Sequence, residues 1–156
     1  MRPKPIGYDK KKASRLMETR NVDVLIATTP RSVFYTSGLP VGHAENNPIM
    51  FSLSNQNPTI VVIYKNGEES LVKWNMYDPA LSWIEEVEGI ESPAQASSAV
   101  VSFIKKAGVE KGTIGIESFT PYYLYEKLKQ SLPNATFKVA DDIFLEMTIM
   151  KSEEEI

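Results

Sequence analysis

The chain carries few of the side chains that usually perform covalent or metal chemistry. It has one histidine, His43, and no cysteine among 156 residues. Thiolate nucleophiles, zinc–thiolate sites and iron–sulfur clusters are therefore excluded together. A Ser-His-acid arrangement would have to use His43, and no Gly-x-Ser-x-Gly segment is present to expose a serine. Because His43 lies in a polar loop, an exposed surface position is the simpler interpretation.

Carboxylates occur in two runs, Asp141-Asp142 and Glu153-Glu154-Glu155, whose members are adjacent in sequence. Adjacent carboxylates do not converge on one ion, whereas acidic residues in a first helical turn are favoured by the helix dipole. We therefore interpret both runs as helix starts and expect no metal site in this chain. The glycines also match neither phosphate-binding loop pattern.

Charge and hydropathy exclude two classes of partner. Lys and Arg number 17 against 20 Asp and Glu, which gives a net charge of -3 and no basic field for nucleic acid. No apolar run approaches the roughly 20 residues of a membrane span, and the first residues lack a secretory apolar segment. We expect a cytoplasmic protein with neither a nucleic-acid nor a membrane partner.

Apolar patterning alternates between strand and helix periods, which predicts an α/β fold with a mixed sheet. The near-continuous apolar run at 22–27 predicts a strand that helices cover on both faces. Asn66-Gly67 predicts a tight hairpin, and 85–91 is interpreted as an acidic connection. Strands are expected at 22–27, 49–52, 59–64, 70–74, 113–117 and 136–139, and helices at 8–20, 30–35, 93–107, 120–132 and from 141 onward.

Aromatic and helical spacing predicts which side chains form the core. In the helix at 120–132 the predicted buried face carries Tyr122, Tyr125, Leu128 and Leu132. For Trp74, Tyr77 and Trp83, core packing is the simpler interpretation and a docking surface is the alternative. The aromatic residues expected in the core are Phe34, Tyr35, Phe51, Tyr64, Phe103 and Phe119.

The last residues form a capping box, with Ser152 at the N-cap and Glu155 three positions later. A helix start without the helix behind it adds little to folding, because nucleation is the costly step. We therefore expect residues 1–150 to form one domain and residues 151–156 to begin a linker helix into further polypeptide.

Three segments together resemble the N-terminal domain of the creatinase/prolidase family. Arg20-Asn-Val-Asp-Val-Leu-Ile26 and Pro30-Arg-Ser-Val-Phe-Tyr-Thr-Ser-Gly38 resemble its first buried strand and its Pro-x-Asn-x-x-Tyr-x-Ser/Thr-Gly turn. Ile114-Gly-Ile-Glu117 resembles a recurring strand of the same domain. Ile149-Met-Lys-Ser-Glu-Glu-Glu-Ile156 resembles the junction into the metal-dependent peptidase domain. Ser32 stands where the family usually has Asn, and Thr148 where the junction normally has Arg.

The resemblance implies a ribonuclease-H-like α/β domain, with a mixed sheet of about five or six strands flanked by helices on both faces. It implies that this domain is not catalytic, and that two divalent metal ions bind to Asp, His and Glu residues of the downstream domain, to which no position here corresponds. The residues that match family motifs are Asp23, Pro30, Tyr35, Gly38 and Lys151.

The implied function is that of an assembly and substrate-access domain in a homodimeric Xaa-Pro dipeptidase or aminopeptidase that cleaves proline-containing peptides. Creatinase-like carbon–nitrogen hydrolases share the fold, so the parent enzyme could be one of these, and a free-standing small-molecule or protein-binding module is a further alternative. In the family, the loop after the Tyr-x-Ser/Thr-Gly turn can approach the active site of the partner subunit. Here that loop runs from Leu39 to Asn47, with Leu39, Pro40, Val41, Gly42, His43 and Glu45 as candidate substrate-access residues.

Overall fold

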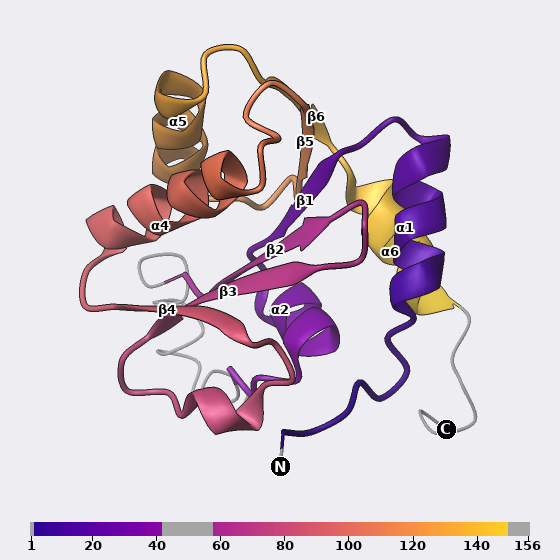
Figure 1. Ribbon diagram of the computed structural model, residues 1–156, viewed down its shortest axis with the longest axis vertical. Coiled ribbons are helices and arrows are strands. Elements are labelled where there is room, and N and C mark those ends of the chain that lie inside the picture. Colours follow the sequence, from indigo (N-terminus) through magenta and orange to yellow (C-terminus); the bar gives the residue numbers. More distant parts are fainter. Residues whose placement is uncertain (1, 42–57, 150–156) are drawn as a thin grey trace.

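The computed structural model describes residues 2–41 and 58–149, and a mixed sheet of six strands forms its centre (Figure 1). The strand order across the sheet is β4-β3-β2-β1-β5-β6. The predicted α/β class is therefore confirmed. The strands are β1 (Val24–Ala27), β2 (Ile60–Tyr64), β3 (Glu69–Trp74), β4 (Glu86–Ile90), β5 (Thr113–Ile116) and β6 (Thr136–Val139).

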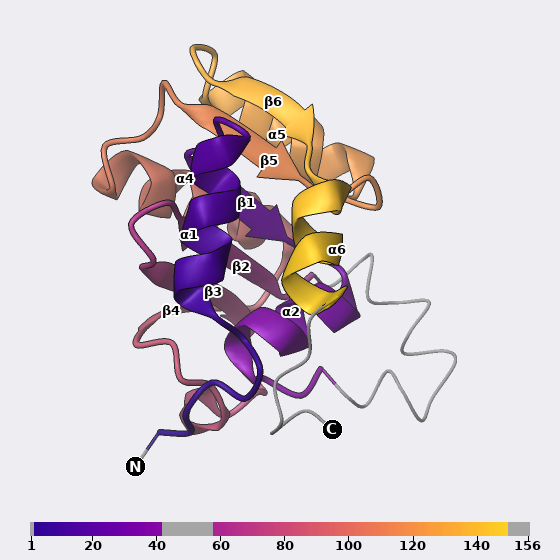
Figure 2. The same cartoon turned by 90° about the vertical axis from the view of Figure 1, so that its right-hand side faces the viewer.

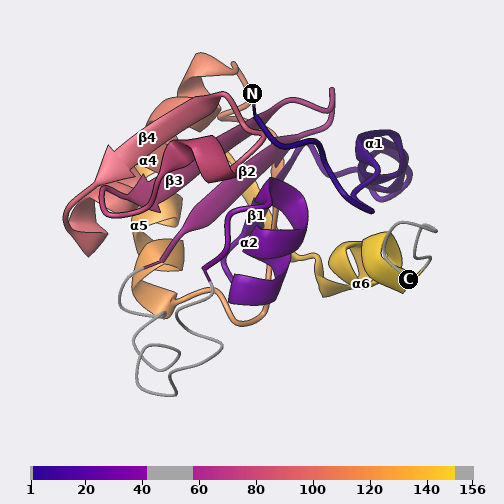
Figure 3. The same cartoon turned by 90° about the horizontal axis from the view of Figure 1, so that it is seen from below.

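Helices cover both faces of this sheet, as Figure 3 shows from below and Figure 2 from the side. Two of them, α4 (Pro93–Lys106) and α5 (Tyr122–Ser131), pack on one face. The other face is covered by α1 (Lys10–Thr19), α2 (Pro30–Ser37) and α6 (Asp141–Ile149). A short 3-10 helix, η1 (Pro79–Leu81), precedes β4. No helix among residues 2–41 and 58–149 is long and apolar enough to cross a membrane.

Three parallel strands end on the same side of the sheet, so the segments that follow them begin close together. Strand β1 pairs in parallel with β5, and β5 pairs in parallel with β6, whereas β2 runs antiparallel to β1. The carboxyl ends of β1, β5 and β6 therefore lie at the same edge. In open α/β sheets this edge is the usual place for functional residues.

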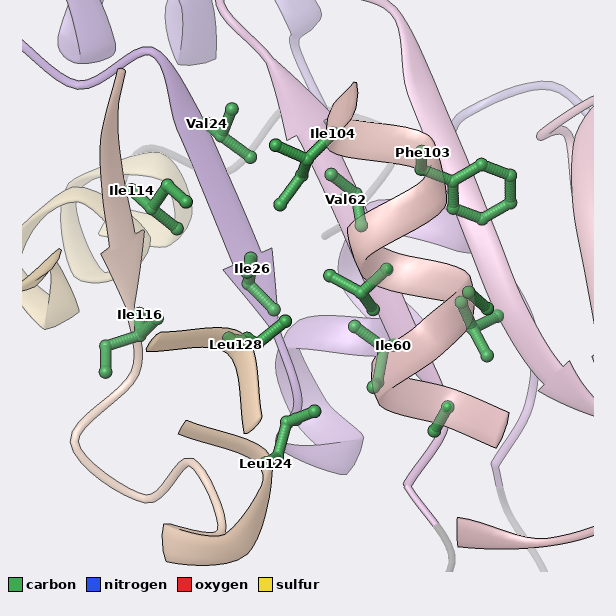
Figure 4. Close-up of a cluster of buried hydrophobic side chains, with 14 of the residues drawn as sticks. Val24, Ile26, Ile60, Val62, Phe103, Ile104, Ile114, Ile116, Leu124 and Leu128 are labelled. Carbon is green, nitrogen blue, oxygen red and sulfur yellow. The ribbon is translucent and has the colours of Figure 1, made fainter. Parts of the chain in front are cut away.

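The first hydrophobic cluster lies between the sheet and helices α4 and α5 (Figure 4). Val24 and Ile26 of β1 point to this side, where Ile104 of α4 and Leu128 of α5 meet them. Leu25 and Ala27 belong to a second cluster, which α1, α2 and α6 cover. Alternate residues of β1 thus enter different clusters, which explains why its sequence is apolar without interruption.

The segment at 85–91 is not a connection, as the sequence suggested, but contains strand β4 at an edge of the sheet. Its backbone pairs in parallel with β3, and its acidic side chains suit an edge strand, which charges protect from further pairing. The hairpin between β2 and β3 is confirmed. Of its turn residues only Gly67 has a positive φ, of 88°.

The predicted buried face of α5 was wrong at its first position. Leu124 and Leu128 are fully buried one turn apart, whereas the Tyr122 side chain is 74% exposed. The helix therefore buries its purely aliphatic side chains and leaves the tyrosine hydroxyl in water.

Phe34 and Phe119 were also predicted in the core, but they are 53% and 80% exposed. Phe34 lies on the outer side of α2, and Phe119 lies in the connection that follows β5. Phe51 and the strand predicted at 49–52 lie outside the described residues. Trp74 packs against the first cluster, and Tyr77 and Trp83 against the second, so core packing is confirmed for these three.

Candidate functional site

A groove of about 550 Å³ lies at the edge where β1, β5 and β6 end. Helices α2 and α6 form two of its walls, and the segment after β5 forms a third. Each contributing segment starts at the end of a strand, which is why the topology brings them together. The lining residues include Arg31, Ser32, Tyr35, Glu117, Phe119, Asp141, Phe144 and Leu145.

Glu117 is the buried acid of this groove and is only 6% exposed. Its Oε2 accepts hydrogen bonds from the backbone N–H groups of Thr28 at 2.6 Å and Thr29 at 2.8 Å. Its Oε1 accepts from the Thr29 hydroxyl at 2.8 Å and from the Ser32 hydroxyl. Both oxygens are therefore occupied by donors from the start of α2.

This bonding makes Glu117 a positioning residue for α2 rather than a general acid or base. A carboxylate that caps a helix N-terminus interacts favourably with the helix dipole and satisfies backbone N–H groups that the helix leaves free. Thr29 is the N-cap residue, and its hydroxyl also accepts a hydrogen bond from the Ser32 N–H at 3.3 Å. Ser32, the departure from the family motif, supplies one of the donors to Glu117.

Three motif residues of α2 and its C-cap determine where the helix begins, where it ends and which neighbouring segments it contacts. Pro30 occupies the first helical turn, where its fixed φ suits the helix and no N–H is needed. Gly38 ends the helix with a φ of 69°. The Tyr35 hydroxyl lies 3.0 Å from the Gly7 carbonyl oxygen and 2.8 Å from that of Met147, so it joins α2 to the segment before α1 and to α6.

Asp23, another motif residue, lies at the opposite end of β1. Its Oδ2 accepts a hydrogen bond from the Thr113 N–H at 2.9 Å, and its Oδ1 pairs with Lys65 Nζ at 2.8 Å. The Lys65 hydrogen bond, together with the Thr113 N–H, lowers the pKa of the Asp23 carboxyl. Asp23 thus ties β1 to β5 and to the β2–β3 hairpin, and its role is structural.

The described part of the candidate substrate-access loop begins inside the core. Leu39 is fully buried in the second cluster, Pro40 is exposed, and Val41 packs partly against the same cluster. The Leu39 N–H donates to Ser37 Oγ at 3.1 Å, directly after the helix. Gly42, His43, Glu45 and Lys151 lie outside the described residues, so their assigned roles remain predictions.

A second buried carboxylate, Glu69, lies on β3 beneath α1. Its side chain is 2% exposed and pairs with Lys10 Nζ at 2.8 Å. Burial raises the pKa of the Glu69 carboxyl, against the opposing effects of Lys10, Tyr8 and Trp83. Burial and the Glu69 charge also raise the pKa of Tyr8 well above its usual range. Since Glu69 lies under the helix and not in the groove at the carboxyl edge, we interpret it as a structural acid.

The raised pKa of Glu69 gives a testable pH dependence. A carboxyl whose pKa is higher in the folded state contributes stability below its unfolded pKa of about 4.3, and this contribution is lost as pH rises through the folded pKa. We therefore expect the stability of the native protein relative to the Glu69→Gln variant to fall as the pH rises above about 4. Urea unfolding at several pH values measures this difference.

The exposed acid Glu85 provides the matched control for this substitution. Its Glu85→Gln variant removes a carboxylate from the surface and is expected to change stability at pH 7 by less than about 0.5 kcal/mol. A pH-independent difference for Glu69→Gln would contradict a raised pKa at the buried site.

Metal ligands are the remaining question for the site. Within residues 2–41 and 58–149, no group of three or more His, Asp and Glu side chains could hold an ion. The buried acid of the groove, Glu117, is already bonded to the start of α2.

The contact between Glu117 and α2 was not predicted from the sequence. The sequence does place Glu117 directly after one apolar strand and Thr28-Thr29 directly after another, and this was the available signal.

Comparison with known proteins gives consistent matches. The family model described as the Creatinase/Prolidase N-terminal domain matches residues 10–147. The Xaa-Pro dipeptidase of Pyrococcus horikoshii is 31% identical to this chain over 147 residues, which cover 94% of this chain and 36% of that protein. This chain therefore spans little more than a third of the length of that curated relative.

Solved structures match most of this chain. The prolidase from Pyrococcus horikoshii OT3 superposes with a TM-score of 0.64 at 25% identity, over 94% of this chain and 36% of that one. The N-terminal domain of the cytoplasmic peptidase PepQ from Mycobacterium tuberculosis H37Rv superposes with a TM-score of 0.65 at 16% identity, over 88% of this chain and 96% of that one. At that identity the second match shows a shared fold only.

Proposed function

This chain belongs to the creatinase/prolidase N-terminal domain family, and from that premise we propose that it is the non-catalytic domain of a longer, metal-dependent Xaa-Pro dipeptidase or aminopeptidase. The observation that carries the proposal is the 31% identity to an Xaa-Pro dipeptidase across 94% of this chain. The bonding of Glu117 supports it, because the buried acid of the groove is committed to the start of α2. Catalytic acids and bases then belong to polypeptide outside residues 1–156.

We also propose that the two divalent ions of the enzyme bind to a domain that follows residues 151–156 in the chain. This proposal is supported by the described residues, which offer no group of three or more potential ligands. When bound there, such ions supply activated water and polarise the scissile carbonyl. We further propose that the enzyme is cytoplasmic.

The domain's own contribution is to direct the loop that follows α2. Three contacts fix the start of this loop: Glu117 at the N-terminus of α2, the Tyr35 hydroxyl at its side, and buried Leu39 directly after its end. A loop with a fixed starting direction can place side chains reproducibly at a neighbouring active site. We propose that His43 and Glu45 shape substrate access to the active site of the partner subunit in a homodimer.

A creatinase-like carbon–nitrogen hydrolase is the second candidate, because the matching family model names creatinase as well as prolidase. The two candidates differ in substrate. The full-length protein should therefore be supplied with divalent metal and assayed on an Xaa-Pro dipeptide and on creatine, beside residues 1–156 alone. We expect turnover of the dipeptide by the full-length protein only.

The proposed substrate-access role of the loop after α2 can be tested with a variant in the same assay. His43→Ala in the full-length protein is expected to lower kcat/KM for the dipeptide by about tenfold, which corresponds to about 1.4 kcal/mol of lost transition-state stabilisation. Lys127→Ala, at an exposed position of α5, is the matched control and is expected to leave kcat/KM unchanged. An unchanged kcat/KM in the His43 variant would contradict the loop's role, and turnover by residues 1–156 would contradict the proposed function itself.

A further inference from the structure

The groove at the carboxyl edge carries apolar side chains that the described residues leave uncovered. Phe119 is 80% exposed and Leu145 of α6 is 57% exposed, and both line the groove with the buried ring of Phe144. Ile149, one helical turn after Leu145 on the same side of α6, is 63% exposed. Apolar patches rimmed by polar residues commonly mark interaction surfaces.

The charged side chains that line this groove differ in whether they already have a hydrogen-bond or ion-pair partner. Asp141 Oδ1 accepts a hydrogen bond from the Ser118 N–H at 2.8 Å, and Asp142 pairs with Arg20 at 2.7 Å. In the described part of the chain, Arg31 has neither a hydrogen-bond partner nor an ion pair. A partner that fits this surface would therefore offer an apolar side chain to Phe119 and Leu145, beside a carboxylate for Arg31.

We propose that this groove is the docking surface for the catalytic domain of the same polypeptide. The proposal rests on the function proposed above. Three observations select this occupant. The dipeptidase relative extends far beyond the match, since 147 matched residues are only 36% of its length, and the matching family model describes an N-terminal domain. The exposed side chains of Leu145 and Ile149 also lie on α6, which is the last described element of the chain (Figure 2).

Proximity strengthens this assignment. A domain that follows α6 in the same polypeptide has a high effective concentration at the groove beside that helix, so a modest apolar contact suffices to hold it. Burial of one phenylalanine or leucine side chain is favourable by about 1.5–3 kcal/mol. A separate protein or a second copy would have to overcome the full entropic cost of association with the same contacts.

The test compares hydrogen exchange of residues 118–124 and of α6 in the full-length protein and in residues 1–156. We expect at least tenfold slower exchange in the full-length protein, and we expect Phe119→Ser and Leu145→Ser to remove that protection. Met76→Ser is the matched control, because Met76 is 73% exposed and does not line the groove. It should leave the protection intact. Arg31→Glu should weaken it, and Arg31→Lys should retain it.

Stability of the shorter protein separates docking from folding. Since Phe119 and Leu145 are exposed, their serine variants should leave the unfolding midpoint of residues 1–156 nearly unchanged. Equal exchange rates in the two proteins would overturn the proposal, as would protection that depends on protein concentration, because the occupant would then be a second copy. The readout does not involve hydrolysis, so an inactive full-length protein that still shows the protection would overturn the proposed peptidase function and leave the docking surface standing.

Discussion

Glu117→Ala is expected to lower the free energy of unfolding of this domain by about 3–5 kcal/mol. The substitution removes the acceptor for the Thr28 and Thr29 N–H groups and for the hydroxyls of Thr29 and Ser32. A buried donor that loses its partner costs about 1–3 kcal/mol, and α2 also loses the negative charge at its N-terminus. Urea unfolding followed by circular dichroism at pH 7 measures the change.

Two further variants make this result specific. Glu117→Gln keeps one acceptor oxygen but loses the charge, so we expect a loss between those of the native protein and the alanine variant. Glu18→Ala removes an exposed acid of α1 and should change stability by less than about 0.5 kcal/mol. If Glu117→Ala were as stable as Glu18→Ala, the carboxylate would not be what positions α2.

Gly38→Ala is expected to destabilise the domain by about 3 kcal/mol, through two effects at one position. Gly38 has a φ of 69°, which costs a residue with a Cβ about 1 kcal/mol. A Cβ there would also lie 2.5 Å from Cζ3 of Trp83. The Trp83 ring cannot move freely, because it packs in the second cluster and stacks with Tyr8 at 6.3 Å between centroids.

Gly108→Ala is the matched control because it separates the cost of a positive φ from the cost of a steric clash with Trp83. Gly108 ends α4 with nearly the same φ, of 71°, yet a Cβ there would meet nothing within 4 Å. We expect only the conformational cost of about 1 kcal/mol at this position. Equal losses for the two glycine variants, measured by thermal unfolding, would show that Trp83 does not hold the end of α2.

Local pattern was sufficient to predict the parts of the fold that local physics decides. The apolar run at 22–27 predicted a strand covered on both faces, and β1 contributes to both clusters. Asn66-Gly67 predicted the hairpin, and Pro30 and Gly38 predicted both ends of α2. In each case the signal and its cause lie within a few residues of one another.

Long-range contacts account for what the sequence did not predict. Strand β4 carries Glu86 and Glu88, and only its pairing with β3 makes it a strand. Glu117 is 85 residues from Ser32, so nothing near either residue indicates their hydrogen bond. The exposure of Phe119 has the same origin, because the periodicity of a segment cannot show which edge of the sheet it will occupy.

We propose that the reactive centre of the full-length enzyme lies outside residues 1–156. Isothermal titration of Mn²⁺ or Co²⁺ into residues 1–156 and into the full-length protein, both first stripped of metal, tests this most directly. We expect no saturable binding to residues 1–156 and binding of two ions per chain to the full-length protein. Tight, stoichiometric binding of a divalent ion to residues 1–156 would contradict the claim.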